Sequence, residues 1–143
     1  MLTEGIYLIK NSQTDRALDS NADQPDLGQV YTGELNRGQY QKWYVKPVDS
    51  SHFWIVDLAT GLQLDSGSGV YTKQHREPDN NQTWKLQQSK DGAYQLTNAA
   101  TLLALEESKA NKQDVLTSHP DAENPYQRWK FTRIDPWISY TGA

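Results

Sequence analysis

Apolar and polar positions alternate along several short stretches of the chain. Residues 5–10, 53–57 and 94–98 alternate apolar or aromatic residues with polar ones, which is the pattern of a strand with one buried face. Shorter runs of the same kind follow each of them. We expect these further strands near residues 17–19, 62–65 and 103–106, near residues 29–32, 69–72 and 114–117, and at three Gln-x-Trp triplets. Segments rich in Asp, Asn, Gly and Pro separate the strands and predict turns.

One stretch has a second interpretation. Residues 102–112 combine Ala, Leu, Glu and Lys, and these residue types favour a helix. The register of the repeat described next favours a strand followed by a loop in the same place. We therefore expect an all-β chain and keep a helix at this position as the alternative.

The chain contains a threefold repeat. The Gln-x-Trp triplet occurs at residues 41–43, 82–84 and 127–129. Upstream of each triplet the same order recurs: an aromatic residue, an Asn or Asp four residues later, and an acid eight residues after that. The aromatic residues are Tyr7, Phe53 and Tyr94, the next positions are Asn11, Asp57 and Asn98, and the acids are Asp19, Asp65 and Glu106. A period of roughly 20–50 residues is typical of folds whose units bury their apolar faces against one another.

These repeats predict the architecture. Three units of about four short strands can bury their apolar faces together in a closed barrel. The sequence therefore predicts a β-trefoil with pseudo-threefold symmetry, and its 143 residues fit a single domain. We expect repeats at residues 5–48, 49–90 and 91–135, with a tail at residues 136–143. The motif tryptophans are expected in the core, because a large aromatic residue in the same register of each unit can pack at a threefold centre.

The triple motif and its preceding acids resemble the ricin B-chain type of lectin domain, most closely the cysteine-free members from mushrooms and other fungi. This resemblance covers residues 6–134. It implies a site made of an acid at the end of the second strand, an aromatic residue about a dozen positions before the motif tryptophan, and an Asn just before the motif glutamine. Such groups suit a sugar, because a carboxylate accepts hydrogen bonds from adjacent hydroxyls, an aromatic face covers a C–H patch and an amide both donates and accepts.

Carried over residue by residue, the resemblance ranks the three repeats. The second repeat keeps every element, and its predicted carbohydrate-binding residues are Asp65, Tyr71, His75, Asn81 and Gln82. The first repeat has a tyrosine at the Asn position, for which the tyrosine itself or a nearby Asn could compensate. Its predicted residues are Asp19, Tyr31, Asn36, Tyr40 and Gln41. The third repeat departs at three positions, including Leu116 in place of the aromatic residue. It is expected to be a weaker site, formed by Glu106, His119, Tyr126 and Gln127.

Structural roles for the same residues also remain open. Asp19 and Asp65 precede Ser or Ser-Gly, which favour tight turns, and the two tyrosines Tyr31 and Tyr71 suit half-buried strand positions. The motif glutamines are expected to hydrogen-bond the backbone or the neighbouring acid. With the acids in exposed loops, Asp65→Ala should weaken sugar binding at little cost in stability.

Composition excludes several other functions. The net charge is −4, from 14 Lys and Arg against 18 Asp and Glu, whereas binding to nucleic acid needs clustered positive charge. There is no cysteine, which excludes disulfides and thiolate zinc sites. The histidines His52, His75 and His119 lack metal-ligand spacing, and motifs for nucleophilic, zinc and glycosidase chemistry are absent. We therefore predict a protein that is not an enzyme, with no catalytic residue, metal or cofactor and no nucleic acid partner.

The N-terminal sequence bears on localisation. Residues 1–6 contain no basic region followed by a long apolar run, so we expect no signal peptide and no membrane insertion. Together with the lack of cysteine, this favours a cytoplasmic protein, with unconventional secretion as a second possibility.

Two functions remain open. The first is a lectin for glycoproteins or glycolipids that end in galactose or N-acetylgalactosamine, with several sites or a homodimer for avidity; the family resemblance adds a role in fungal defence. The second is a β-trefoil protease inhibitor acting through a proline-containing loop at residues 24–28 or 76–80. The retained acids and aromatic residues favour the lectin. Trp54 and Trp137 lie outside the repeat pattern and could cover the bottom of a barrel or form a subunit contact.

Overall fold

Twelve β-strands and three short 3-10 helices follow one another in the computed structural model, which describes residues 2–21, 27–36, 38–67, 69–76, 80–110 and 113–134. Each repeat has the same order: three strands, a 3-10 helix and a fourth strand. The first repeat contains β1 (Gly5–Asn11), β2 (Ala17–Ser20), β3 (Leu27–Gly33), η1 (Gln39–Gln41) and β4 (Trp43–Pro47). The second contains β5 (His52–Asp57), β6 (Gln63–Ser66), β7 (Val70–Lys73), η2 (Asn80–Gln82) and β8 (Trp84–Gln88). The third contains β9 (Tyr94–Asn98), β10 (Ala104–Glu107), β11 (Val115–Ser118), η3 (Pro125–Gln127) and β12 (Trp129–Arg133).

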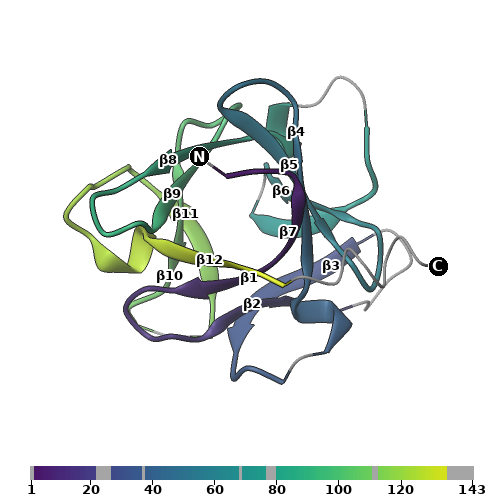
Figure 1. Ribbon diagram of the computed structural model, residues 1–143, viewed down its shortest axis with the longest axis horizontal. Helices are drawn as coiled ribbons and strands as arrows, with labels where there is room; N and C mark the ends of the chain where they lie inside the picture. Colours follow the sequence, from purple (N-terminus) through teal and green to yellow (C-terminus); the bar gives the residue numbers. More distant parts are fainter. Residues whose placement is uncertain are drawn as a thin grey trace.

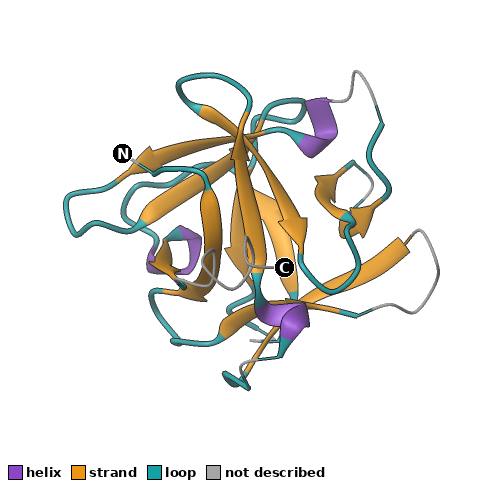
Figure 2. Cartoon of the chain, turned by 45° about the vertical axis from the view of Figure 1, so that its right-hand side comes forward, coloured by secondary structure: helices purple, strands orange, loops and turns teal. Residues whose placement is uncertain are grey.

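The secondary structure confirms the predicted all-β class and corrects one detail. The described part of the stretch 102–112 contains β10 and no helix, so the helical alternative is wrong. The glutamine of each triplet, however, ends a 3-10 helix instead of lying in a strand, and the tryptophan begins the next strand. The cause is a backbone turn, since the N–H of the middle residue bonds back to the first residue of the helix at 3.2 Å in every repeat. The three helical turns lie at three separate corners of the molecule (Figure 2).

Six strands close into a barrel. Strand β1 pairs with β12 and β4, β5 pairs with β4 and β8, and β9 pairs with β8 and β12, all antiparallel. These strands surround the centre of the molecule in Figure 1. The other six strands form the hairpins β2–β3, β6–β7 and β10–β11, and β3 also pairs with β7. A closed six-stranded barrel with three hairpins is the predicted β-trefoil.

The three motif tryptophans pack in the core, as predicted. Trp43, Trp84 and Trp129 are 0% exposed. Each indole N–H donates a hydrogen bond of 2.9 or 3.0 Å to a backbone carbonyl on the second strand of its own repeat. The accepting residue, Leu18, Leu64 or Leu105, stands directly before the acid of its repeat, which is Asp19, Asp65 or Glu106. Burial of the indole therefore also fixes the strand that carries the acid.

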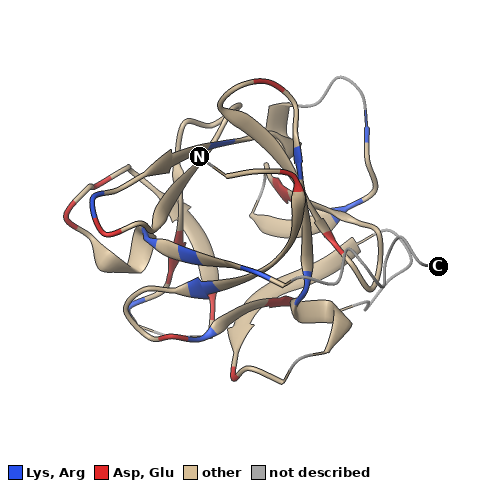
Figure 3. Cartoon of the chain, in the orientation of Figure 1, with Lys and Arg blue, Asp and Glu red and all other residues tan. Residues whose placement is uncertain are grey.

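Charge is distributed over the molecule without an evident grouping by sign. Basic and acidic positions are interspersed along the described chain (Figure 3). Among the described residues, no helix has the length and apolar character needed to cross a membrane.

Candidate functional site

In every repeat the motif glutamine connects the acid to the loop that follows the third strand. Its Nε2 group donates both to the acid and to a backbone carbonyl, and its Oε1 atom accepts a backbone N–H. In the second repeat the partners of Gln82 are Asp65 at 3.1 Å, the Gln74 carbonyl at 2.8 Å and the Arg76 N–H at 3.1 Å. All three glutamines are at most 1% exposed. They hold the acids and loops in place, which confirms the expected structural role.

The second repeat brings its predicted acid and aromatic residue together. Asp65 on β6 pairs with Tyr71 on β7, so the two side chains are neighbours on one face of the hairpin. The half-buried Tyr71 ring lies against Gly69, where an added Cβ would come within 2.9 Å of Tyr71 Cε2. Gly69 also has a φ of +152°, a conformation that favours glycine. Asn81 Nδ2 donates to the Ser66 carbonyl at 2.7 Å and so holds η2 against the end of β6.

The burial of Asp65 bears on the expected stability cost of Asp65→Ala. Asp65 lies on a strand and is 1% exposed, so it is not in an exposed loop. Because its carboxylate accepts a hydrogen bond from the buried Gln82 amide, truncation would also remove an internal contact. The expected exposed loop is therefore wrong, and we now expect Asp65→Ala to lower stability as well.

His75 lies at the edge of the second site. Its Nδ1 atom is 2.9 Å from Gln63 Oε1, and Gln63 stands two residues before Asp65, on the same face of β6. The His75 ring also packs against Trp54, with ring centroids 4.7 Å apart. Trp54, which the repeat left unexplained, therefore belongs to the surroundings of the second site. Trp137 lies outside the described residues.

The first repeat has the same pairing of acid and aromatic residue. Asp19 on β2 pairs with Tyr31 on β3, and Asp19 is 6% exposed. Its Oδ2 atom accepts from Gln41 Nε2 at 2.9 Å and its Oδ1 atom accepts the Ser20 N–H at 2.8 Å. Burial raises the pKa of Asp19 above its ordinary value, and the two hydrogen bonds partly oppose that shift. Since a carboxylate has about four acceptor positions, Asp19 can still accept hydrogen bonds from a ligand.

The two residues considered for the missing Asn of the first repeat are placed differently. Tyr40 in η1 stands directly before Gln41, in the position that Asn81 has in the second repeat, and is 42% exposed. Asn36 donates its backbone N–H to Gln41 Oε1 at 2.9 Å, while its side-chain Oδ1 accepts the Gly38 N–H at 2.7 Å. The Asn36 side chain thus bonds within its own loop, whereas Tyr40 has an exposed side chain at the chain position that corresponds to Asn81.

In the third repeat, protein groups satisfy the acid. Glu106 Oε1 accepts from Gln127 Nε2 at 3.0 Å, from Asn124 Nδ2 at 3.2 Å and from Ser118 Oγ at 2.6 Å. The residue paired with Glu106 on β11 is Leu116, which offers no aromatic face. Sequence reasoning missed Asn124 because it stands three residues before the motif glutamine and not directly before it. The acid of this repeat therefore has a structural role.

The other two residues predicted for the third site support the same conclusion. His119 enters the network through its backbone carbonyl, which accepts from Gln127 Nε2 at 2.9 Å, and its side chain is exposed. The Tyr126 N–H donates to Asn124 Oδ1 at 3.0 Å, and the Lys109 ammonium lies 5.7 Å from the Tyr126 ring centroid. These contacts link the two residues to the network around Glu106.

Each paired aromatic residue also has a neighbour from another repeat. Gln29 on β3 pairs with Tyr71 on β7, and Asp114 forms an isolated bridge with Tyr31. Both neighbours are exposed, so each could contact a ligand that covers the aromatic ring. Sequence reasoning missed them because it compared positions within each repeat, whereas these contacts cross from one repeat to the next.

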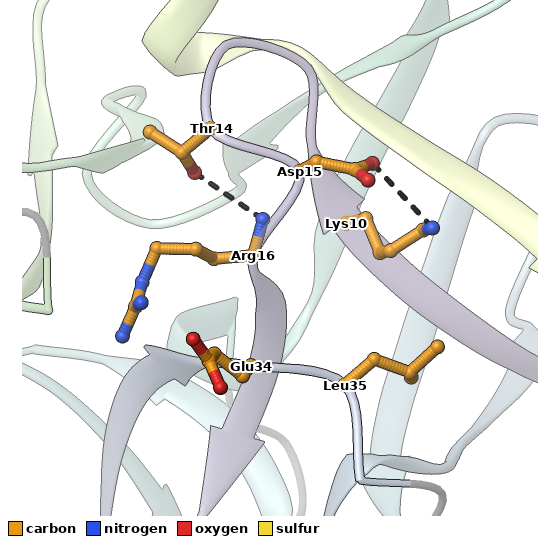
Figure 4. A pocket seen from close by; sticks show the side chains of 6 residues that line it. All are labelled: Lys10, Thr14, Asp15, Arg16, Glu34 and Leu35. Carbon is orange, nitrogen blue, oxygen red and sulfur yellow. Dashed lines mark hydrogen bonds and ion pairs between the residues drawn. The ribbon is translucent and has the colours of Figure 1, made fainter.

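A hollow of about 490 Å³ lies beside the first site (Figure 4). It is lined by Lys10, Thr14, Asp15, Arg16, Glu34 and Leu35. The Glu34 carbonyl accepts from Gln41 Nε2 at 2.8 Å, which connects this hollow to the first site. Its acids and bases do not form a metal site, and no group of three or more metal-ligating side chains occurs among the described residues.

The fold, together with the family match that follows, defines the class of protein, a β-trefoil carbohydrate-binding domain. Residues 5–129 match the family described as ricin-type beta-trefoil lectin domain, and the chain belongs to this family. No curated protein matches the chain.

Solved structures share this fold at low sequence identity. The designed threefold-symmetric protein ThreeFoil superposes with a TM-score of 0.81 at 21% identity, over 91% of this chain and 99% of that one. Polyporus squamosus lectin, solved with Neu5Aca2-6Galb1-4GlcNAc, gives 0.79 at 15% identity, over 93% of this chain and 50% of that one. A mosquitocidal holotoxin gives 0.84 at 20% identity, over 94% of this chain but 18% of its own length. This chain thus corresponds to one part of the two larger proteins.

Proposed function

We propose that this chain is a non-catalytic lectin that binds glycans ending in galactose or N-acetylgalactosamine through its first and second repeats. The observation that carries the proposal is the pairing of Asp65 with Tyr71, and of Asp19 with Tyr31, across adjacent strands. A sugar ring placed on either tyrosine would have its hydroxyls next to a carboxylate that accepts hydrogen bonds. The third repeat keeps the scaffold but lacks the aromatic residue.

The choice of sugar follows from the chemistry of each pair. An aromatic face covers a C–H patch of a galactose-like ring, while the carboxylate accepts hydrogen bonds from two adjacent hydroxyls. The glycan in the Polyporus squamosus lectin structure contains galactose between Neu5Ac and GlcNAc, which supports binding of a galactose-containing glycan here. Single sites of this kind bind with about millimolar to micromolar affinity, or about 4–8 kcal/mol.

Two sites on one chain would allow cross-linking of glycoproteins or glycolipids. Occupying both can raise the effective affinity about a hundredfold without new contacts, and a homodimer would add to this. We further propose a defensive role of the kind known for cysteine-free fungal members, to which the likeness to a mosquitocidal holotoxin lends support. Residence in the cytoplasm, with release by an unconventional route, remains part of this proposal.

The protease inhibitor is not favoured by a specific contact. Of its candidate loops, residues 24–26 and 77–79 lie outside the described residues. A protease inhibition assay run beside the glycan experiments therefore tests this alternative.

The test begins with a glycan array and continues with isothermal titration of the best glycan. Tyr71→Ala and Tyr31→Ala should each remove one of two binding sites, because each loses an aromatic platform. Leu116→Ala is the matched control on β11 and should leave the number of sites unchanged. Binding to no glycan on the array, or equal stoichiometry in all three variants, would overturn the proposal.

A further inference from the structure

Asp57 is a buried carboxyl that neither candidate site uses. It ends β5 and is 0% exposed, and its Oδ1 atom accepts the Ala59 N–H at 3.0 Å. Its Oδ2 atom is buried and has no hydrogen-bond partner in the described structure. Because a buried polar atom without a partner destabilises a protein, Oδ2 requires an explanation.

The two other repeats have an amide where the second has this carboxyl. Asn11, Asp57 and Asn98 each pair with the motif tryptophan of a neighbouring strand. Each side chain also uses Oδ1 to accept the N–H of the residue two positions later, at 3.0 Å in all three cases. Since the three side chains have the same orientation, Asp57 Oδ2 takes the place of an asparagine Nδ2.

Both asparagine Nδ2 groups donate to the same kind of acceptor. Asn98 donates to the Asn81 carbonyl and Asn11 donates to the Tyr126 carbonyl, each at 2.9 Å. Asn81 and Tyr126 stand directly before the motif glutamines. This bond therefore fastens a barrel strand to the 3-10 helix that borders a candidate site.

The equivalent acceptor for Asp57 is the Tyr40 carbonyl. The next residue, Leu58, donates its N–H to the Lys42 carbonyl at 2.9 Å, which places β5 against η1. The residues after Asn11 and Asn98 make the same bond at 2.8 and 2.9 Å. An ionised Oδ2 would face this carbonyl as a second acceptor and repel it, whereas a protonated carboxyl can donate.

We propose that Asp57 is protonated in the folded protein and donates a hydrogen bond to the Tyr40 carbonyl, which makes the geometry of the first candidate site depend on pH. Asp57 is thus a positioning residue that acts through Tyr40. The effect on glycan binding rests on the proposed function, whereas the effect on stability does not.

The electrostatic surroundings support the bound proton. Burial raises the pKa of Asp57 to about 7; hydrogen bonds from the Ala59 and Thr60 backbone oppose this shift, and the Asp19 charge adds to it. The ionisable residues on the elements packed around it are Asp19, Tyr40, Lys42, Tyr44, Lys46, His52, Asp65 and Lys85. Three of these have other partners: Tyr44 bonds to Glu4, His52 to Asp49 and Asp65 to Gln82.

The direction of the pH dependence follows from these values. An aspartate in the unfolded chain titrates near about 3.9, so between about pH 4 and pH 7 the folded state binds more protons than the unfolded state. The contribution of Asp57 to stability is complete below about pH 4, decreases as the pH rises and is lost above about pH 7. Glycan binding at the first site should then fall at low pH, where Asp19 is protonated, and again above about pH 7, where Asp57 ionises.

Asp57→Asn is the matched variant, because it installs the amide that the other two repeats already have. Thermal melts of the parent and of Asp57→Asn between about pH 4.5 and pH 8.5 measure the stability effect. We expect the melting temperature of the parent to fall relative to the variant by about 10 °C, steadily from about pH 4.5 to about pH 7 and with a plateau above about pH 7. The histidines are common to both proteins, so the difference isolates Asp57.

A reverse variant and a glycan titration complete the experiment. Asn98→Asp should acquire the pH-dependent loss of stability that Asp57→Asn removes. In a Tyr71→Ala background, which leaves the first site, Asp57→Asn should abolish the loss of glycan affinity above about pH 7. Parallel melting curves for parent and Asp57→Asn, or a carboxyl ¹³C signal of Asp57 that titrates near about pH 4, would overturn the proton assignment. If the melting temperatures behave as expected but Asp57→Asn leaves the pH dependence of glycan affinity unchanged, Asp57 does not act on the first site. If the parent binds no glycan at any pH, the proposed function is wrong instead.

Discussion

Glu106→Ala should cost more stability than Asp65→Ala while leaving glycan binding intact. Glu106 Oε1 accepts three side-chain hydrogen bonds, while Asp65 accepts from Gln82 Nε2, which also has the Gln74 carbonyl as acceptor. Removing Glu106 takes this acceptor away from Asn124 Nδ2, and Asn124 is only 9% exposed to solvent.

The magnitude can be worked from these contacts. A buried donor left without a partner costs about 1–3 kcal/mol. Gln127 Nε2 and Ser118 Oγ still bond to each other at 2.9 Å, so their loss is smaller. Loss of the one buried methylene, Cγ, adds about 0.8 kcal/mol. We expect Glu106→Ala to lower the free energy of unfolding by about 3 kcal/mol, and Asp65→Ala by about 2 kcal/mol.

Urea unfolding followed by tryptophan fluorescence measures both values, because the motif tryptophans are buried. Equal m values would show that the change lies in stability and not in the surface exposed on unfolding. Titration with the best glycan supplies the second measurement. The structural role of Glu106 would be refuted if its truncation cost less than about 1 kcal/mol, or if it removed a glycan site that Asp65→Ala leaves in place.

Two further predictions concern the proposed sites. Gly69→Ala should weaken glycan binding at the second site, because the added Cβ would lie 2.9 Å from Tyr71 Cε2 and displace the ring. Isothermal titration should then show a lower affinity at the second site and an unchanged affinity at the first. Glycan affinity at the first site should fall as acidification protonates Asp19, whose pKa burial raises, because the protonated carboxyl offers fewer acceptors. Glycan titrations at decreasing pH measure this loss of affinity. A first site that binds the glycan equally well in the Asp19→Asn variant would contradict the role of the Asp19 charge.

Most of the fold could be predicted from the sequence because its signal repeats three times. Each Gln-x-Trp triplet marks a 3-10 helix followed by a barrel strand, and the period places the remaining strands to within one or two residues. Residues 102–112 have a composition that favours a helix, but β10 forms there because its pairing with β11 outweighs local propensity. The helix at each motif glutamine was missed because a single backbone turn leaves no periodic pattern.

The candidate sites could be predicted only where their residues belong to one repeat. Asp65 and Tyr71 lie on the two strands of one hairpin, so their proximity follows from the local pairing. Gln29 beside Tyr71, and Asp114 beside Tyr31, come from pairings between repeats that spacing alone does not reveal. The partnerless Oδ2 of Asp57 was equally hidden, because the sequence shows an acid at this position but not the carbonyl that it faces.

The third repeat shows why the triplet predicts the fold more directly than it predicts binding. Gln127 and Trp129 make the same bonds to an acid and to the carbonyl before it as their counterparts do in the other repeats. These bonds stabilise the hairpin without a ligand, so they can persist in a repeat that binds nothing. What separates the repeats is the residue paired with the acid, Tyr71 against Leu116, and Glu106 also accepts from Asn124. Exchanging Leu116 for Tyr would restore the aromatic residue of the third repeat, while Glu106 Oε1 would still accept from Gln127, Asn124 and Ser118.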